Sequence, residues 1–169
     1  MKLPVALYLA PGLIGLDLAT KIWALGALDA SNPAIALAPG LSLRLAFNSG
    51  VSFGFFSGSP VLVLIVTTVL VLALTIWFVR TSSARDALAL GCIIAGAVSN
   101  LADRGVHGAV TDFLAWGPRD SPFFVNNLAD IWITAGVLIL FSGPMLHSIG
   151  SMRSKSAKRL RNSLPQSST

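Results

Sequence analysis

Apolar residues gather in four long stretches of the chain, separated by polar and charged segments. The stretches cover residues 3–28, 60–79, 86–103 and 130–149. A bilayer core of about 30 Å needs about 20 residues of helix, so runs of this length predict membrane-spanning helices. The third run has only 16 uncharged residues between Asp86 and Asp103, so it must use its polar flanks at the interfaces. Asp86 is the residue type that caps a helix start, and we expect it to be the N-cap of this span.

The first stretch has an alternative interpretation as a cleaved signal peptide, because Lys2 precedes an apolar run. Asp17 and Lys21, however, interrupt the run where such a peptide should be purely apolar. We therefore expect residues 3–28 to form a span.

Between the first two spans and between the last two, apolar residues alternate with small or polar ones. This alternation covers residues 41–47, 51–56 and 110–116 and predicts strands. The expected fold is an all-α membrane core of four transmembrane helices with a small extracytoplasmic β-sheet.

Composition agrees with a membrane protein. Apolar residues make up 54% of the 169 positions and charged residues only 11%, against about 25% charged in soluble domains. This excludes a soluble enzyme, a disordered protein and a nucleic-acid-binding module as the main interpretation. Cys92 is the single cysteine, so no intrachain disulfide can form.

The basic residues predict the orientation in the membrane. One side would hold Lys2, Arg80, Arg85 and five residues of the tail, whereas the other would hold Arg44, Arg104 and Arg119. The positive-inside rule then places both termini in the cytoplasm. Residues 1–150 form one membrane-embedded domain with outer segments 29–59 and 104–129, and residues 151–169 form a basic, disordered tail.

With this orientation, the polar residues in or beside the spans converge near the outer surface. Asp17 and Lys21 are four positions apart and can pair on one helix face. The other members of this set are Asn48, Asn100, Asp103, Arg104, Asp112, Asn127 and Asp130. Ionisable groups in a membrane are costly, which makes this level of the protein a candidate functional site.

Two acids of the set, Asp112 and Asp130, suit catalysis if they share a pocket. Close carboxylates cannot both ionise easily, so one can act as a base on water while the protonated partner polarises a carbonyl group. Three alternatives remain open: an ion path of a small transporter subunit, ion pairs of a non-catalytic membrane protein, and a metal-dependent hydrolase that uses His107.

Five segments resemble the motifs of signal peptidase II, the bacterial lipoprotein signal peptidase family. They are, in order, Asp17-Leu-Ala-Thr-Lys21, Phe47-Asn-Ser-Gly-Val-Ser-Phe-Gly54, Ala95-Gly-Ala-Val-Ser-Asn-Leu-Ala-Asp-Arg104, Val110-Thr-Asp-Phe113 and Asn127-Leu-Ala-Asp130. The chain departs from the family pattern at Ala95 and Ser99, where glycine is usual, at Ser52, where alanine is usual, and at Asn126, where phenylalanine is usual. Either Asn126 or Asn127 could then fill the asparagine role, and the three-residue step to Asp130 favours Asn127.

The resemblance implies a role for each matching residue. Asp112 and Asp130 match the catalytic aspartates of an aspartic endopeptidase. Asn48, Asn100, Arg104 and Asn127 match residues that line the substrate pocket, with Arg104 holding a backbone carbonyl group. Asp17, Lys21 and Asp103 match residues that support the site.

The implied substrate is a prolipoprotein whose lipobox cysteine carries a diacylglyceryl group, and the bond cut lies just before that cysteine. The implied location is the bacterial inner membrane, with the site near the outer leaflet and a second outer helix or lid beside a β-cradle. The partners are lipid-modified prolipoproteins and membrane lipids. We expect no cofactor, no metal, no nucleic acid and a monomeric protein.

Overall fold

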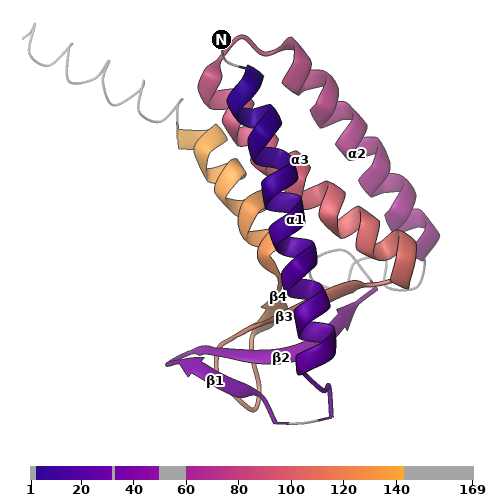
Figure 1. Cartoon of the computed structure of the whole chain (residues 1–169), viewed down its shortest axis with the longest axis vertical. Helices are drawn as coiled ribbons and strands as arrows, with labels where there is room; N and C mark the ends of the chain where they lie inside the picture. The colour runs from indigo at the N-terminus through magenta and orange to yellow at the C-terminus, as the bar shows by residue number, and fades with distance from the viewer. Residues whose placement is uncertain (1–2, 32, 50–59, 143–169) are drawn as a thin grey trace, which may run out of the picture.

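In the part of the chain that the structure describes, four helices and four short strands make up the fold (Figure 1). The computed structural model describes residues 3–31, 33–49 and 60–142. The helices are α1 (Leu3–Ala27), α2 (Pro60–Arg80), α3 (Ala84–His107) and a fourth helix over Leu128–Ser142. The first three contain segments long and apolar enough to cross a membrane, and the fourth is apolar but shorter in its described part. The fourth starts two residues before the predicted span, and its predicted end lies outside the described residues.

The surface of α2 is what a lipid environment requires. Several of its large apolar side chains, among them Ile65, Val69 and Leu72, are exposed over more than half of their area. Exposed apolar area of this extent is unfavourable in water, so these helices need an apolar surrounding.

Helix α3 packs against both α1 and α2, and small residues allow its close approach to the fourth helix. A methyl group on Gly96 would collide with the backbone oxygen of Ala129, and one on Gly136 would lie 2.5 Å from that of Ala89. Backbones that approach this closely are typical of membrane helix pairs with small interface residues.

The start of α3 corrects one prediction. Asp86 is not the N-cap; Ser83 is, because its backbone is extended and its side-chain oxygen accepts from the Asp86 N–H at 3.3 Å. Asp86 lies in the first turn, where its charge still suits the helix dipole. The helix therefore begins earlier than predicted and runs for 24 residues, so it is longer than the predicted span.

The sheet is antiparallel, with the order β1-β2-β3-β4. Its strands are β1 (Ile35–Ala38), β2 (Leu41–Asn48), β3 (Val110–Trp116) and β4 (Phe124–Asn126). The strands predicted over 41–47 and 110–116 are confirmed and pair with each other, whereas β1 and β4 were not predicted. The strand predicted over 51–56 lies outside the described residues. The second outer helix implied by the resemblance is absent from residues 29–31, 33–49 and 108–127, the described parts of the outer segments.

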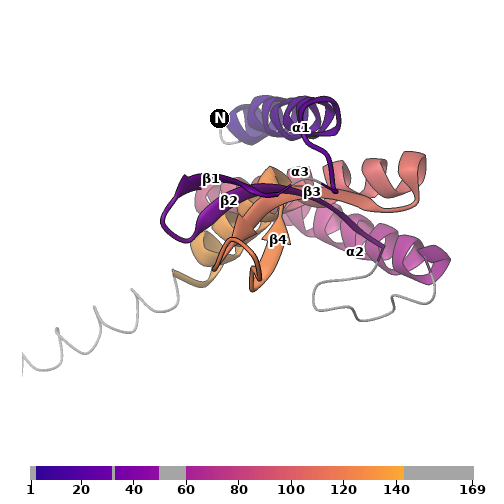
Figure 2. The same cartoon turned by 90° about the horizontal axis from the view of Figure 1, so that it is seen from below.

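The sheet lies at one end of the helical bundle, where α1 and α3 end and the fourth helix begins (Figures 1 and 2). Strand β3 packs against both α3 and α1. The rings of Trp23 on α1 and Phe113 on β3 meet edge to face, with centroids 6.5 Å apart. This end of the fold therefore joins residues from three helices and the central strands.

Candidate functional site

The predicted polar residues of the helices and of β3 meet in a buried cluster at the sheet end of the bundle. Helix α1 contributes Asp17 and Lys21, and α3 contributes Asn100 and Asp103. Asp112 lies in the middle of β3, and Asn127 and Asp130 flank the start of the fourth helix. The convergence follows from the chain path, because each of these segments passes the same level of the molecule.

Lys21 is the cation at the centre of this cluster. Its Nζ atom lies 2.9 Å from Oδ2 of Asp17, 3.5 Å from Oδ2 of Asp103 and 2.8 Å from Oδ1 of Asn100. The predicted pair of Asp17 and Lys21 is therefore confirmed. Three acceptors surround one ammonium group, which compensates for the cost of burying it.

Asp17 also connects α1 to two other helices. Its Oδ2 accepts from the Ser99 hydroxyl of α3 at 2.6 Å, and its Oδ1 accepts from the backbone N–H of Ala129 at 2.7 Å. The second bond satisfies one of the free amides in the first turn of the fourth helix. Asp17 thus fixes the start of the helix that carries Asp130.

Asp103 has partners at the junction of α3 and β3. Its Oδ2 accepts from the backbone N–H of Thr111 at 2.6 Å, and its Oδ1 lies 2.7 Å from Nδ1 of His107. Asp103 therefore holds the residue that precedes Asp112 in the strand.

Asp112 lies on β3 opposite Ala46 of β2 and is buried. Its Oδ1 accepts from Nδ2 of Asn127 at 2.6 Å, and the Asn48 amide also bonds to the carboxyl. Loss of solvent, with the Asp130 charge second, raises the pKa of Asp112 to about 7, against the lowering effect of the two amides and Lys21. A carboxyl of this kind holds a proton near neutral pH.

Asp130 lies in the first turn of the fourth helix, close to Asp112. Its Oδ1 accepts from Nδ2 of Asn100 at 2.9 Å, and its backbone N–H donates to Oδ1 of Asn127 at 3.1 Å. The side chain of Asn127 thus contacts both acidic residues and caps the helix. Asn127 and Asn100 are also joined, with Nδ2 of the first 3.2 Å from Oδ1 of the second.

The neighbouring asparagines have different surroundings. Asn127 is fully buried between the two acids, whereas Oδ1 of Asn126 accepts from Nε1 of Trp116 at 2.9 Å. The geometry thus agrees with the choice of Asn127 as the asparagine beside the acids. Asn126 instead connects β4 to the aromatic side chain of β3.

A cavity of about 460 Å³ opens beside Asp130. Asn48 and Asn126 supply further polar atoms, and Phe123 and Phe124 belong to its apolar part. The charges of Asp130 and Asp112 act on the half-buried guanidinium group of Arg104. A peptide backbone bound in this cavity would face Asp130 and Asn48, which lie in the cavity wall.

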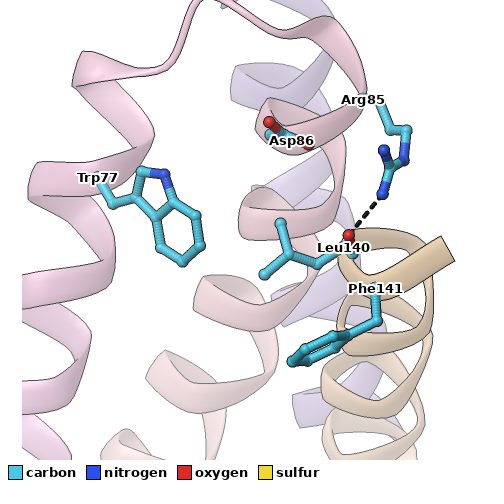
Figure 3. A pocket seen from close by; sticks show the side chains of 5 residues that line it. All are labelled: Trp77, Arg85, Asp86, Leu140 and Phe141. Atoms are coloured by element: carbon cyan, nitrogen blue, oxygen red, sulfur yellow. Dashed lines mark hydrogen bonds between the residues drawn. The ribbon is translucent and has the colours of Figure 1, made fainter. Parts of the chain in front are cut away.

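A second cavity, of about 470 Å³, lies at the other end of the bundle (Figure 3). It is lined by Trp77, Arg85, Asp86, Leu140 and Phe141. Arg85 donates to the backbone oxygen of Leu140, so it ties the start of α3 to the fourth helix. Its lining has one carboxylate and therefore lacks the paired acids of the sheet end.

No group of three or more His, Cys, Asp or Glu side chains in residues 3–31, 33–49 and 60–142 could hold an ion. His107, considered as a ligand in the sequence, is half exposed and bonds to Asp103.

Sequence reasoning missed two contributors to the cluster. Ser99 was noted only as a departure from the family pattern, and the Ala129 amide belongs to a residue without a polar side chain. The one signal for Ser99 was its place in the third motif, one residue before Asn100. The bonds to Asp17 depend on contacts between helices that no local pattern reveals.

Comparison with known proteins gives consistent relatives. Residues 9–145 match the family described as Signal peptidase (SPase) II. A lipoprotein signal peptidase of Rhodopseudomonas palustris is 36% identical over 148 residues, covering 81% of this chain and 90% of that protein. One of Bifidobacterium adolescentis is 38% identical over 141 residues, covering 77% and 72%.

Two solved structures share the fold, and both are described as bacterial membrane enzymes. One has a TM-score of 0.73 at 22% identity and covers 98% of this chain and 94% of its own. The other has a TM-score of 0.71 at 24% identity, with coverages of 81% and 90%. On the family match and these relatives together, the chain belongs to the Signal peptidase (SPase) II family.

Proposed function

We propose that the protein is an aspartic endopeptidase that removes signal peptides from bacterial prolipoproteins. The bond cut lies just before the diacylglyceryl-modified lipobox cysteine. One observation carries this proposal: a single side chain, that of Asn127, donates to the Asp112 carboxyl and accepts from the backbone N–H of Asp130. Membership of the family and the names of its relatives supply the substrate class.

In the proposed reaction the two carboxyl groups share one proton. The ionised group takes a proton from a water molecule, and the resulting hydroxide bonds to the scissile carbonyl carbon. The protonated group donates a hydrogen bond to the carbonyl oxygen. When the C–N bond breaks, the proton taken from the water passes to the departing cysteine nitrogen.

The surrounding polar residues divide into two proposed roles. Asn48 and Arg104 contact the substrate backbone, which fits the place of Asn48 in the cavity wall and the partial exposure of Arg104. Asn100 and Asn127 act at the pocket mainly on the two aspartate carboxylates, since each amide donates a hydrogen bond to one of them. The site is stabilised by Asp17, Lys21 and Asp103.

In the membrane, we place the protein as a four-span protein of the bacterial inner membrane. The fourth helix belongs to the fourth span, which was predicted over 130–149. Both termini are cytoplasmic, and the site faces the outer leaflet. Residues 1–150 act as one catalytic domain and residues 151–169 as a basic tail. Lipid acyl chains of the substrate can then stay in the bilayer while the peptide enters the cavity. The protein acts as a monomer without a cofactor.

A reporter fusion tests this orientation. A reporter joined after Ser82, between α2 and α3, should give a cytoplasmic signal, whereas one placed at Asp120 should give an external signal. An external signal at Ser82 would overturn the orientation without touching the chemistry.

Cleavage of a diacylglyceryl-modified lipobox peptide by the purified protein tests the activity. Wild type should cut before the modified cysteine, and Asp112→Asn and Asp130→Asn should each lose nearly all turnover while retaining substrate binding. Chelator should have no effect, and His107→Ala should keep most of the activity.

Each alternative predicts a different result. A folded but inert wild type would favour a non-catalytic membrane protein or a transporter subunit. Loss of activity with chelator would favour the metal-dependent hydrolase. Cleavage by either aspartate variant would exclude the aspartate pair.

A further inference from the structure

Lys21 has three acceptors for its three ammonium hydrogens, and one of them is not an acid. Besides Asp17 and Asp103, its Nζ atom lies 2.8 Å from Oδ1 of Asn100, which is 79 positions away in the chain. The side chain is 3% exposed, so water does not compete for these bonds. A lysine ammonium can donate but cannot accept.

This one-way chemistry fixes the direction of the Asn100 amide. The atom facing Lys21 has to be the oxygen, so the amide nitrogen faces Oδ1 of Asp130 at 2.9 Å. The Asn127 amide is fixed in the same manner, because the backbone N–H of Asp130 donates to its oxygen. Its nitrogen therefore faces Asp112.

The two acids nevertheless differ in their surroundings. Asp130 lies in the first turn of a helix, where the dipole favours negative charge, and Asp112 lies in a strand. The charged groups acting on Asp130 are Lys21 and Asp17 from α1, Arg104 from α3 and Asp112 from β3. An N–H donor from Asn100 favours the ionised form of Asp130, whereas the amide oxygen would favour the protonated form.

We propose that Lys21 is a positioning residue of the reaction: it directs the Asn100 amide so that Asp130 is the ionised carboxylate and Asp112 carries the shared proton. This inference rests on the proposed function and assigns the two roles. Asp130 takes the proton from water as the hydroxide bonds to the carbonyl carbon, and the Asp112 proton bonds to the carbonyl oxygen. Without Lys21, only the longer bond of 3.2 Å from Nδ2 of Asn127 still holds the Asn100 oxygen, so the Asn100 amide is freer to turn over and present its oxygen to Asp130.

Rate measurements across pH test this role with Lys21→Met, Asn100→Ala and the double variant. Each single change should reduce kcat about 10- to 100-fold and move the acid limb of the profile up by about one pH unit, with KM changed little. The double variant should differ from Asn100→Ala only by the direct effect of losing the Lys21 charge on Asp130, because Lys21 otherwise acts through that amide. Lys21→Arg should displace the acid limb less than Lys21→Met does.

A charge-balanced variant keeps the inference testable if Lys21→Met does not fold. Lys21→Met combined with Asp17→Asn removes one buried charge of each sign, and this pair should show the same displaced limb. An acid limb that stays in place in a folded variant, or effects that multiply in the double variant, would overturn the inference. These results count only where wild type cleaves and both aspartate variants are inactive; an inert wild type would instead contradict the proposed function.

Discussion

Oδ1 of Asp17 accepts a hydrogen bond of 2.7 Å from the backbone N–H of Ala129, 112 positions further along the chain. The first helix thus holds the first turn of the fourth, one residue from Asp130. The bond explains how a residue outside the reaction can control the geometry of the site.

Replacing Asp17 should therefore damage both stability and activity. Asp17→Ala removes the ion pair of Lys21 with Asp17, leaves the one with Asp103, and leaves the Ala129 amide unsatisfied. The expected loss of unfolding free energy is about 3–5 kcal/mol. Unfolding followed in detergent measures it. Asp120→Ala, at an exposed loop position, is the control and should change the value by less than about 0.5 kcal/mol. Equal stability of the two variants would contradict the role of Asp17.

The raised pKa of Asp112 predicts a pH dependence of stability. An aspartate in the unfolded chain titrates near 3.9, and in the folded protein the pKa is raised to about 7. Between these values the folded state holds a proton that the unfolded state has lost. Unfolding free energy should therefore fall as pH rises from about 4 to about 7 and be independent of this group above that.

The Asp112→Asn variant isolates this contribution, because asparagine does not titrate. Its stability relative to wild type should increase with pH across the window, by at most about 4 kcal/mol in total. Unfolding midpoints of both proteins between pH 4 and 8 provide the measurement. A difference that is constant over this range would show that Asp112 titrates normally.

Much of this organisation could be predicted, because periodicity and spacing are local properties. The long apolar runs predicted α1, α2 and α3, and the four-residue step from Asp17 to Lys21 predicted their ion pair. Alternation over 110–116 placed Asp112 in a strand. Strands β1 and β4 have only four and three residues, and alternation over so few positions cannot be distinguished from chance.

The remainder depends on contacts between distant segments. Nothing around Asn100 indicates that its amide joins Lys21 to Asp130, since those partners come from two other helices. The predicted N-cap of α3 was wrong by three residues. Ser83 and Asp86 are both good capping residues, and backbone geometry decides between them. Asn126 and Asn127 are adjacent residues of one type, so only their burial and partners in the fold distinguish them.

Close packing between α3 and the fourth helix should depend on Gly96. A methyl group there would collide with the Ala129 backbone oxygen and lie 2.8 Å from Cγ1 of Ile133. Gly96→Ala should push the fourth helix away, lower stability by about 1–3 kcal/mol and reduce kcat. Gly105→Ala, also in α3, is the matched control because nothing lies within 4 Å of its added methyl group. A Gly96→Ala variant as stable as Gly105→Ala would contradict the role of the contact, because helix propensity alone favours alanine over glycine by about 1 kcal/mol in both positions.

Ser99 offers the most selective test of the support around Asp17. Its buried hydroxyl donates to Asp17 at 2.6 Å, and a hydrogen bond to a charged group contributes about 1.5–3 kcal/mol. Ser99→Ala should lose this amount in detergent unfolding. Its kcat should stay within about threefold of wild type, because Asp17 keeps Lys21 and the Ala129 amide. Thr75→Ala is the control, since that exposed hydroxyl donates only to a carbonyl of its own helix. A large fall in kcat for Ser99→Ala without loss of stability would mean that the hydroxyl acts on the reaction itself.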